Sequence, residues 1–122
     1  MINSIKLALI GLALGSAASM AGDCPAPSDP TLPDGATATM EEMLAGQKAV
    51  KEYQAANSEY RACLDPQVSA AEVAAAGDSP SQEAVAALKK LNDDYNASVS
   101  KEEELATKFN AALRAYKTAH PG

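Results

Sequence analysis

Two cysteines are the residues of this chain whose chemistry is easiest to assign. Cys24 and Cys63 are separated widely in the sequence, with no Cys-x-x-Cys pair. The single histidine, His120, lies near the end of the chain and completes no metal-ligand set with them. In an oxidising compartment, an even number of cysteines indicates a disulfide. We therefore predict a Cys24–Cys63 disulfide with a structural role.

The acidic residues are the second group that could carry out chemistry. Carboxylates occur side by side at Asp93 and Asp94 and at residues 102–104. Consecutive residues on a helix point about 100° apart, so these groups cannot converge on one bond as a glycosidase pair does. The sequence also has no Ser/His/Asp arrangement, no glycine-rich phosphate loop and no calcium-loop spacing. We predict a protein that is not an enzyme and has no catalytic residue, metal site or cofactor.

Composition limits both the size of the core and the kind of partner. The 122 residues include 10 Lys+Arg and 16 Asp+Glu, a formal net charge of −6, and no tryptophan. The hydrophobic fraction is 47%, but much of it is alanine, which favours helices and buries little apolar area. An acidic chain without a basic cluster repels phosphates and anionic headgroups. We expect one small helical domain that binds neither nucleic acid nor anionic membrane surfaces.

Residues 1–21 have the pattern of a signal peptide. Lys6 is their only charge, an apolar run spans residues 7–14, and small residues precede Ala21. The apolar run is shorter than the roughly 20 residues that a transmembrane helix needs. We predict cleavage after Ala21, or alternatively after Ala18, followed by release to the periplasm or the medium without membrane insertion. The mature chain would carry 9 basic and 16 acidic side chains.

Residues 22–39 are expected to form an extended arm. The segment contains four of the seven prolines, at Pro25, Pro27, Pro30 and Pro33, and this density favours polyproline II over helix. Residues 24–39 in this form reach roughly 46–50 Å, whereas residues 40–63 of a helix cover only about 35 Å. The arm is therefore long enough to run back along a first helix and reach Cys63.

The first helical stretch is expected to begin at about Met40. Thr39 and Glu42 have the spacing of a capping box, and helical spacing of apolar residues continues to residue 64. Pro66 then predicts either a kink or a fresh start, because proline disfavours helical geometry at the residue before it. The expected helices are thus 40–64 and 66–76, ending in a turn at Gly77.

A second long helix is expected over residues 80–117. Ser79 fits the N-cap position, Pro80 the first helical position, and Gln82 the third position of a capping box. A three-four spacing of mainly apolar residues then continues to Tyr116. Residues 118–122 are expected to form a flexible tail.

The two stretches are similar in length and joined by a short turn, which predicts an all-α, antiparallel two-helix hairpin with the arm tied back by the disulfide. Pairing about residue 78 places together positions whose numbers sum to about 156. Tyr53 then falls near Glu102, so we expect its phenol to donate a hydrogen bond to that carboxylate. Asn57 and Asn92 interrupt the apolar stripes, where each either fixes the register or lines a wet gap.

Residues throughout the mature chain carry a family resemblance. They are Cys24-Pro25-Ala26-Pro27, Pro30, Pro33-Asp34-Gly35, Met43, residues 47–51, Tyr60, Cys63, residues 95–99, Phe109-Asn110 and residues 113–117. In these the chain resembles a group of small, exported, uncharacterised helical-hairpin proteins of proteobacteria with a Cys-Pro-rich N-terminal arm. The resemblance implies a bacterial, periplasmic or secreted protein, and it implies no activity and no functional residue.

Three functions of different classes fit these features. The first is an interaction or structural module of the bacterial envelope that self-associates or binds a protein partner through apolar surface that two helices cannot bury. The second is a periplasmic chaperone or stress-binding protein that uses the same surface for unfolded clients. The third is a small protein inhibitor that presents the turn at residues 77–81.

Overall fold

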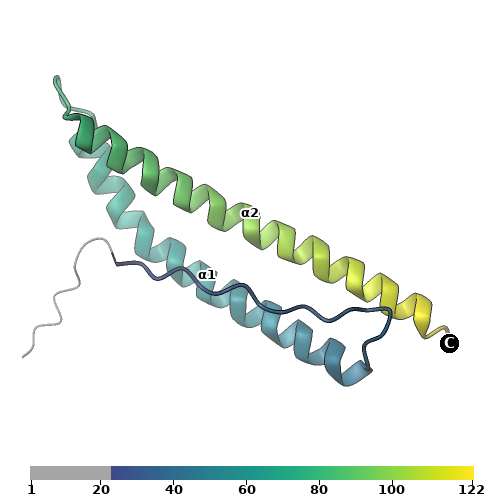
Figure 1. Cartoon of the computed structure of the whole chain (residues 1–122). Helices are drawn as coiled ribbons and strands as arrows, with labels where there is room; N and C mark the ends of the chain where they lie inside the picture. The colour runs from purple at the N-terminus through teal and green to yellow at the C-terminus, as the bar shows by residue number, and fades with distance from the viewer. Residues whose placement is uncertain (1–22) are drawn as a thin grey trace, which may run out of the picture.

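Two long helices make up most of residues 23–122, the part of the chain that the computed structural model describes. Helix α1 (Met40–Ala75) and helix α2 (Gln82–Ala119) run antiparallel around a short turn (Figure 1). No strand occurs among these described residues. The predicted all-α hairpin is therefore confirmed. The predicted signal peptide, residues 1–21, lies outside the described residues.

The start of α1 has the capping box that the sequence predicts. The Oγ1 atom of Thr39 accepts a hydrogen bond from the backbone N–H of Glu42 at 3.1 Å. The Oε2 atom of Glu42 accepts one from the backbone N–H of Thr39 at 2.8 Å. The two bonds satisfy backbone donors that have no partner within the helix, so α1 begins at Met40.

Helix α1 does not restart at Pro66, so the alternative of separate helices over 40–64 and 66–76 is wrong. Its 36 residues form one continuous helix with Pro66 inside it. Proline lacks an N–H, which removes one backbone hydrogen bond. Leu64 is only 3% exposed and Val68 is half-buried. Burial of Leu64 before Pro66 and partial burial of Val68 after it offset the lost bond and keep the helix continuous.

The ends of the helices next to the turn differ from the prediction by one to two residues. Helix α1 ends at Ala75, and α2 begins at Gln82 with Ser81 as its N-cap. The predicted cap at Ser79 and start at residue 80 are therefore wrong. The Oγ atom of Ser81 accepts a hydrogen bond from the N–H of Ala84 at 3.1 Å, so the nearer serine satisfies the first turn and Pro80 stays outside the helix.

The far end of α2 is also longer than predicted. The helix continues to Ala119, and the backbone N–H of His120 donates to the carbonyl of Tyr116 at 3.0 Å. The imidazole ring of His120 stacks on the ring of Tyr116 with the centroids 4.2 Å apart. This contact supports the last turn, so helix replaces the first two residues of the expected tail.

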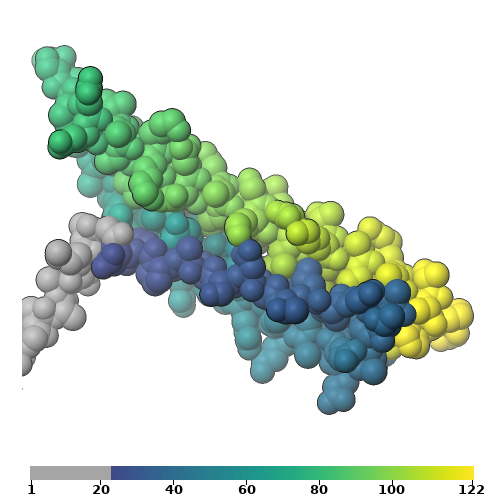
Figure 2. Space-filling model, viewed as in Figure 1, coloured from purple at the N-terminus to yellow at the C-terminus, as the bar shows by residue number. Residues whose placement is uncertain are grey.

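The arm forms a third layer over the two helices. Residues 23–34 are extended and follow the junction between α1 and α2, antiparallel to α1 (Figures 1 and 2). Half-buried residues recur at every third position, at Cys24, Pro27, Pro30 and Pro33. This is the period of a polyproline II helix, which has three residues per turn. One edge of the arm therefore faces the helices along its whole length.

A tight turn returns the chain from the arm to α1. The Oδ1 atom of Asp34 accepts a hydrogen bond from the N–H of Ala36 at 3.0 Å. The carbonyl of Asp34 accepts two more, from Thr37 at 3.1 Å and from Ala38 at 2.8 Å. Asp34 thus closes this turn and fixes the position of the arm's C-terminal end on the helices.

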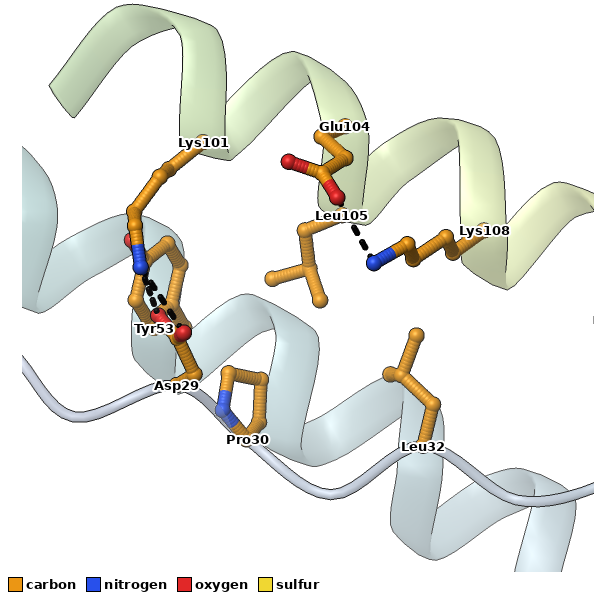
Figure 3. A pocket seen from close by; sticks show the side chains of 8 residues that line it. All are labelled: Asp29, Pro30, Leu32, Tyr53, Lys101, Glu104, Leu105 and Lys108. Atoms are coloured by element: carbon orange, nitrogen blue, oxygen red, sulfur yellow. Dashed lines mark hydrogen bonds and ion pairs between the residues drawn. The ribbon is translucent and has the colours of Figure 1, made fainter. Parts of the chain in front are cut away.

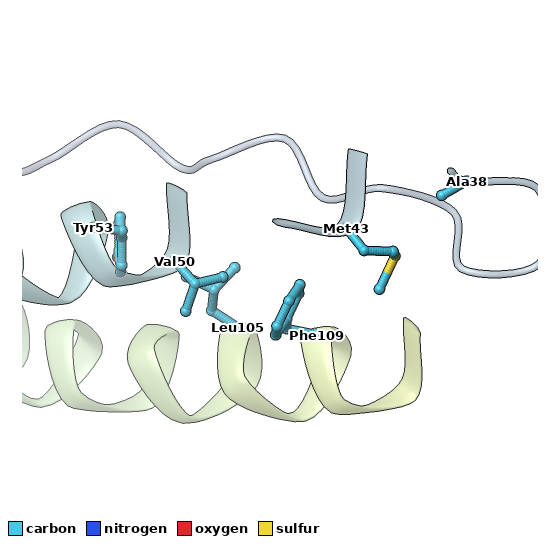
Figure 4. Packing of buried hydrophobic residues seen from close by; sticks show 6 residues of the cluster. All are labelled: Ala38, Met43, Val50, Tyr53, Leu105 and Phe109. Carbon is cyan, nitrogen blue, oxygen red and sulfur yellow. The ribbon is translucent and has the colours of Figure 1, made fainter. Parts of the chain in front are cut away.

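The buried core lies at one end of the hairpin. Its apolar cluster is drawn in Figure 4 and comprises Ala38, Met43, Val50, Tyr53, Leu105 and Phe109. Leu32 of the arm packs against this cluster, together with Ala112, Leu113 and Tyr116 of α2. No residue from 65 to 97 is buried. The half of the hairpin next to its turn, which we call the distal half, therefore lacks a core of its own.

Candidate functional site

The disulfide closes the free end of the arm onto α1. Cys24 and Cys63 are bonded, with their Cα atoms 5.8 Å apart, and they are 39 positions apart in the sequence. The side-chain amide nitrogen of Gln67, one turn along α1, lies 3.1 Å from the sulfur of Cys24. The structure thus contains the predicted pair, and the arm is held at both ends, by the bond and by the turn at Asp34.

Two glycines let the arm approach the helices closely. A Cβ atom added to Gly46 of α1 would lie 2.6 Å from Cδ of Pro33 and 3.3 Å from the ring of Phe109. A Cβ atom added to Gly35 would overlap the carbonyl oxygen of Ala112 in α2. Each glycine therefore provides the space that one contact of the arm requires.

A hollow lies where the arm passes over the middle of the helices. It measures about 270 Å³ and is lined by Asp29, Pro30, Leu32, Tyr53, Lys101, Glu104, Leu105 and Lys108 (Figure 3). The Nζ atom of Lys101 bonds both carboxylate oxygens of Asp29, at 2.8 and 3.1 Å. That hydrogen bond raises the pKa of Lys101, and burial raises the pKa of the Tyr53 phenol. The ion pair of Asp29 with Lys101 and the apolar side chains of Leu32 and Leu105 therefore hold the arm here.

A network of polar side chains joins the two helices beside the core. Asn57, only 1% exposed, donates to the carbonyl of Ser98 at 3.0 Å and accepts from its hydroxyl at 2.7 Å. Asn57 also donates to Oε2 of Glu102 at 3.1 Å, and Arg61 donates to the same atom at 2.6 Å. The pairing of Asn57 with Ser98 agrees, within one residue, with the predicted register.

The carboxylate of Glu102 has different partners from the one predicted. We expected a hydrogen bond from Tyr53, but the donors are Arg61 and Asn57. Arg61 lies two turns further along α1 than Tyr53, and its longer cationic side chain reaches the carboxylate. A charged donor gives a stronger hydrogen bond than a phenol, which explains the choice. Of the two stripe asparagines, Asn57 fixes the register, whereas Asn92 is exposed.

We predict that Asn57→Ala lowers the free energy of unfolding by about 2 kcal/mol, because it removes buried hydrogen bonds and leaves a small cavity. Asn92→Ala is the matched control, since it changes the same residue type on the exposed part of the stripe. Its effect should stay within about 0.5 kcal/mol. Urea denaturation followed by circular dichroism measures both values. Equal effects of the two substitutions would contradict a structural role for the network.

A pH dependence follows from the same network. The hydrogen bond from Arg61, opposed in part by burial and aided by Asn57, lowers the pKa of Glu102 below its ordinary value of 4.5. Because the folded protein then binds this proton less readily than the unfolded chain, stability is present above about pH 4.5 and is lost as the pH falls through the folded pKa. We predict that Glu102→Gln flattens the stability profile between about pH 5 and 3. The neighbouring exposed substitution Glu103→Gln should keep the wild-type slope, and a wild-type slope in Glu102→Gln would contradict the assignment.

Three of the remaining adjacent carboxylates pair with lysines of their own helix. Asp93 and Asp94 each accept from the lysine four residues earlier, Lys89 at 2.6 Å and Lys90 at 2.7 Å. Glu104 likewise pairs with Lys108 at 2.7 Å. The structure does not bring these groups together. Among residues 23–122, no group of three His, Cys, Asp or Glu side chains could hold a metal ion.

A second hollow continues the course of the arm beyond its disulfide. It measures about 490 Å³ and is lined by Cys24, Tyr60, Leu64, Gln67, Ala87, Lys90, Leu91 and Asp94. We call this the distal groove, because it lies between the helices in the half of the hairpin next to the turn. Its lining combines the apolar side chains of Leu64, Ala87 and Leu91 with the ion pair of Lys90 and Asp94. Neither described helix is long and apolar enough to cross a membrane.

Sequence reasoning missed the two glycines and the Arg61–Glu102 pair. Gly46 lies on the inward side of α1, three residues after Met43, and a glycine at such a place signals close approach of another segment. Arg61 lies four residues after Asn57, so both side chains share one helix face. The sequence contains both spacings, but it does not show which residue of the arm or of α2 lies against Gly46 or Arg61.

The chain was also compared with known proteins. No family model, curated protein or solved structure matches it.

Proposed function

We propose that this protein is a non-enzymatic interaction module of the bacterial envelope, exported to the periplasm or secreted, that binds a protein partner or a second copy of itself. One observation carries the proposal: every buried residue lies outside the range 65–97. The arm and the network complete the structure at one end of the hairpin only. The distal half, which lacks a buried core, is left for a partner.

The apolar side chains of the distal half support this reading. Val73 is 78% exposed and Val85 is 50% exposed, and Leu88 and Leu91 are half-buried. Two helices alone cannot bury these side chains, because each helix covers only one side of the other. Exposed apolar surface next to polar edges is typical of protein interaction sites.

The disulfide supports export. A bond between Cys24 and Cys63 persists in oxidising compartments, and small exported domains use such bonds when their core is thin. The signal-peptide pattern of residues 1–21 points the same way. Location in the periplasm or the medium is part of the proposal.

Site-specific photo-crosslinking in the exported protein tests the proposal. A photoreactive phenylalanine at Val73 should give a discrete crosslinked product, either a dimer or one adduct with another protein. The same residue at Lys48, whose side chain is 78% exposed at the opposite end of α1, is the matched control and should stay monomeric. Monomer alone at both positions would contradict the proposal.

A client-binding chaperone is the second candidate, and the open distal groove is the observation that favours it. Such a protein should suppress the aggregation of a heat-unfolded client protein, and the variant Leu91→Lys, in the lining of the groove, should lose this effect. Crosslinking at Val73 would then give many products in place of one. A single product and no suppression would leave only the first candidate.

A further inference from the structure

The arm shows what kind of ligand the junction of α1 and α2 accepts. It is an extended segment in which every third residue is half-buried against the two helices, and three of these residues are prolines. Its carboxylate at Asp29 is bound by Lys101 of α2, and Tyr53 of α1 lines the same hollow beside this pair (Figure 3). The protein therefore already contains one bound polyproline II segment together with the surface that recognises it.

The distal groove repeats the main features of that surface. Lys90 precedes Lys101 by eleven residues, and Leu64 follows Tyr53 by eleven residues. Eleven residues are close to three helical turns, so each pair lies on the same side of its helix. Lys90 and Leu64 line the distal groove, as Lys101 and Tyr53 line the hollow under the arm. The junction of the two helices thus has the same combination at two places: a lysine from α2 and a large, mainly apolar side chain from α1.

The arm itself cannot fill this second surface. Cys24 is fixed to Cys63 at the near end of the groove. After the predicted cleavage behind Ala21, two residues precede Cys24, and two residues extend by only about 7 Å. The Nζ atom of Lys90 meanwhile pairs with Asp94 of its own helix, with its side chain 76% exposed, an arrangement that a stronger acidic partner can displace.

We propose that the distal groove binds an extended, proline-containing segment of a partner protein, which places a carboxylate on Lys90 as Asp29 is placed on Lys101. The segment would lie end to end with the arm along the same junction. This inference rests on the proposed function and specifies the partner's chemistry. It excludes a second folded hairpin as the occupant of this groove.

A peptide that copies residues 24–34, with the substitution Cys24→Ser, is the probe. It is titrated into the oxidised, exported protein, and backbone amide shifts are followed by NMR. We expect saturable shifts at residues around Gln67 and Leu91, and small ones around Lys101. Replacing the peptide's Asp29 by Asn should weaken binding about fivefold, since one ion pair at an exposed site is lost.

Two lysine variants separate recognition from general charge. Lys90→Glu removes the cation at the groove and should weaken binding by about fivefold or more. Lys89→Glu makes the same change one residue away, where the lysine pairs with Asp93 outside the groove, and should leave the affinity unchanged. Both lysines are exposed and both pair with the residue four positions later, so the effects on folding are matched.

Three results would overturn the inference: no shifts at about 1 mM peptide, shifts centred on Lys101, or equal weakening by Lys89→Glu and Lys90→Glu. A discrete crosslink at Val73 without peptide binding would overturn this inference and leave the proposed function standing. Absence of any crosslink at Val73 would count against the proposed function, whatever the peptide does.

Discussion

Reduction of the Cys24–Cys63 disulfide should lower the free energy of unfolding by about 4 kcal/mol. Closing a loop of this size restricts the unfolded chain by that amount in the chain-entropy model. A two-helix protein whose apolar cluster, among residues 23–122, lies at one end of the hairpin has little stability to lose. We therefore expect the reduced protein to be partly or wholly unfolded at 37 °C.

Thermal melts followed by circular dichroism, with and without reductant, measure this effect. The double variant Cys24→Ser/Cys63→Ser is the control, because it should match the reduced protein and show no response to reductant. Without the bond, the end of the arm at Cys24 should also become accessible to proteases. An unchanged melting temperature in reductant would show that the arm contributes nothing through its covalent link.

Gly35→Ala should destabilise the protein by about 3 kcal/mol, the second-largest effect that we predict. The added Cβ would overlap the carbonyl oxygen of Ala112, which belongs to the backbone of α2 and cannot rotate away. Either the turn at Asp34 or the last turns of α2 must move. Because this turn holds one end of the arm, the packing of Leu32 on the core should be weakened as well.

Gly77→Ala is the matched control for that substitution. It is also a glycine in a turn, but a Cβ added there meets nothing within 4 Å. Its effect should stay within about 0.5 kcal/mol, or be slightly favourable because alanine restricts the unfolded chain. Urea denaturation gives both values. Similar unfolding free energies for the two variants would show that the turn at Asp34 is not held against α2.

The secondary structure was readable from the sequence because it depends on local signals. The capping box at Thr39, the proline-rich arm and the paired cysteines are each contained in a few residues, and the structure has all three. The start of α2 was not decided locally, because Ser79 and Ser81 are both suitable caps. The separate helix after Pro66 was wrong for a related reason, since packing around Pro66 offsets the missing hydrogen bond, and that packing depends on the other helix.

The contacts of the arm with the helices, and of one helix with the other, could not be predicted from such local signals. Gly46 is informative only when Pro33 is known to lie on it, and that position depends on the route of the arm. The partner of Glu102 followed from side-chain reach across the helices, where the register alone favoured Tyr53. Sequence periodicity therefore placed the surfaces that face each other, and side-chain geometry decided which atoms meet.

The arm also has a consequence for the order in which the chain folds. Its contacts join residues far apart in sequence, such as Asp29 with Lys101, whereas helical contacts are local and form within about a microsecond. Stable docking of the arm therefore follows hairpin formation and accompanies oxidation, the slowest step, because the reduced chain is expected to be partly or wholly unfolded. With two cysteines, a single intramolecular pairing exists. Formation of the Cys24–Cys63 bond thus requires an oxidant but no disulfide isomerase, and its rate should follow the oxidising power of the surrounding medium.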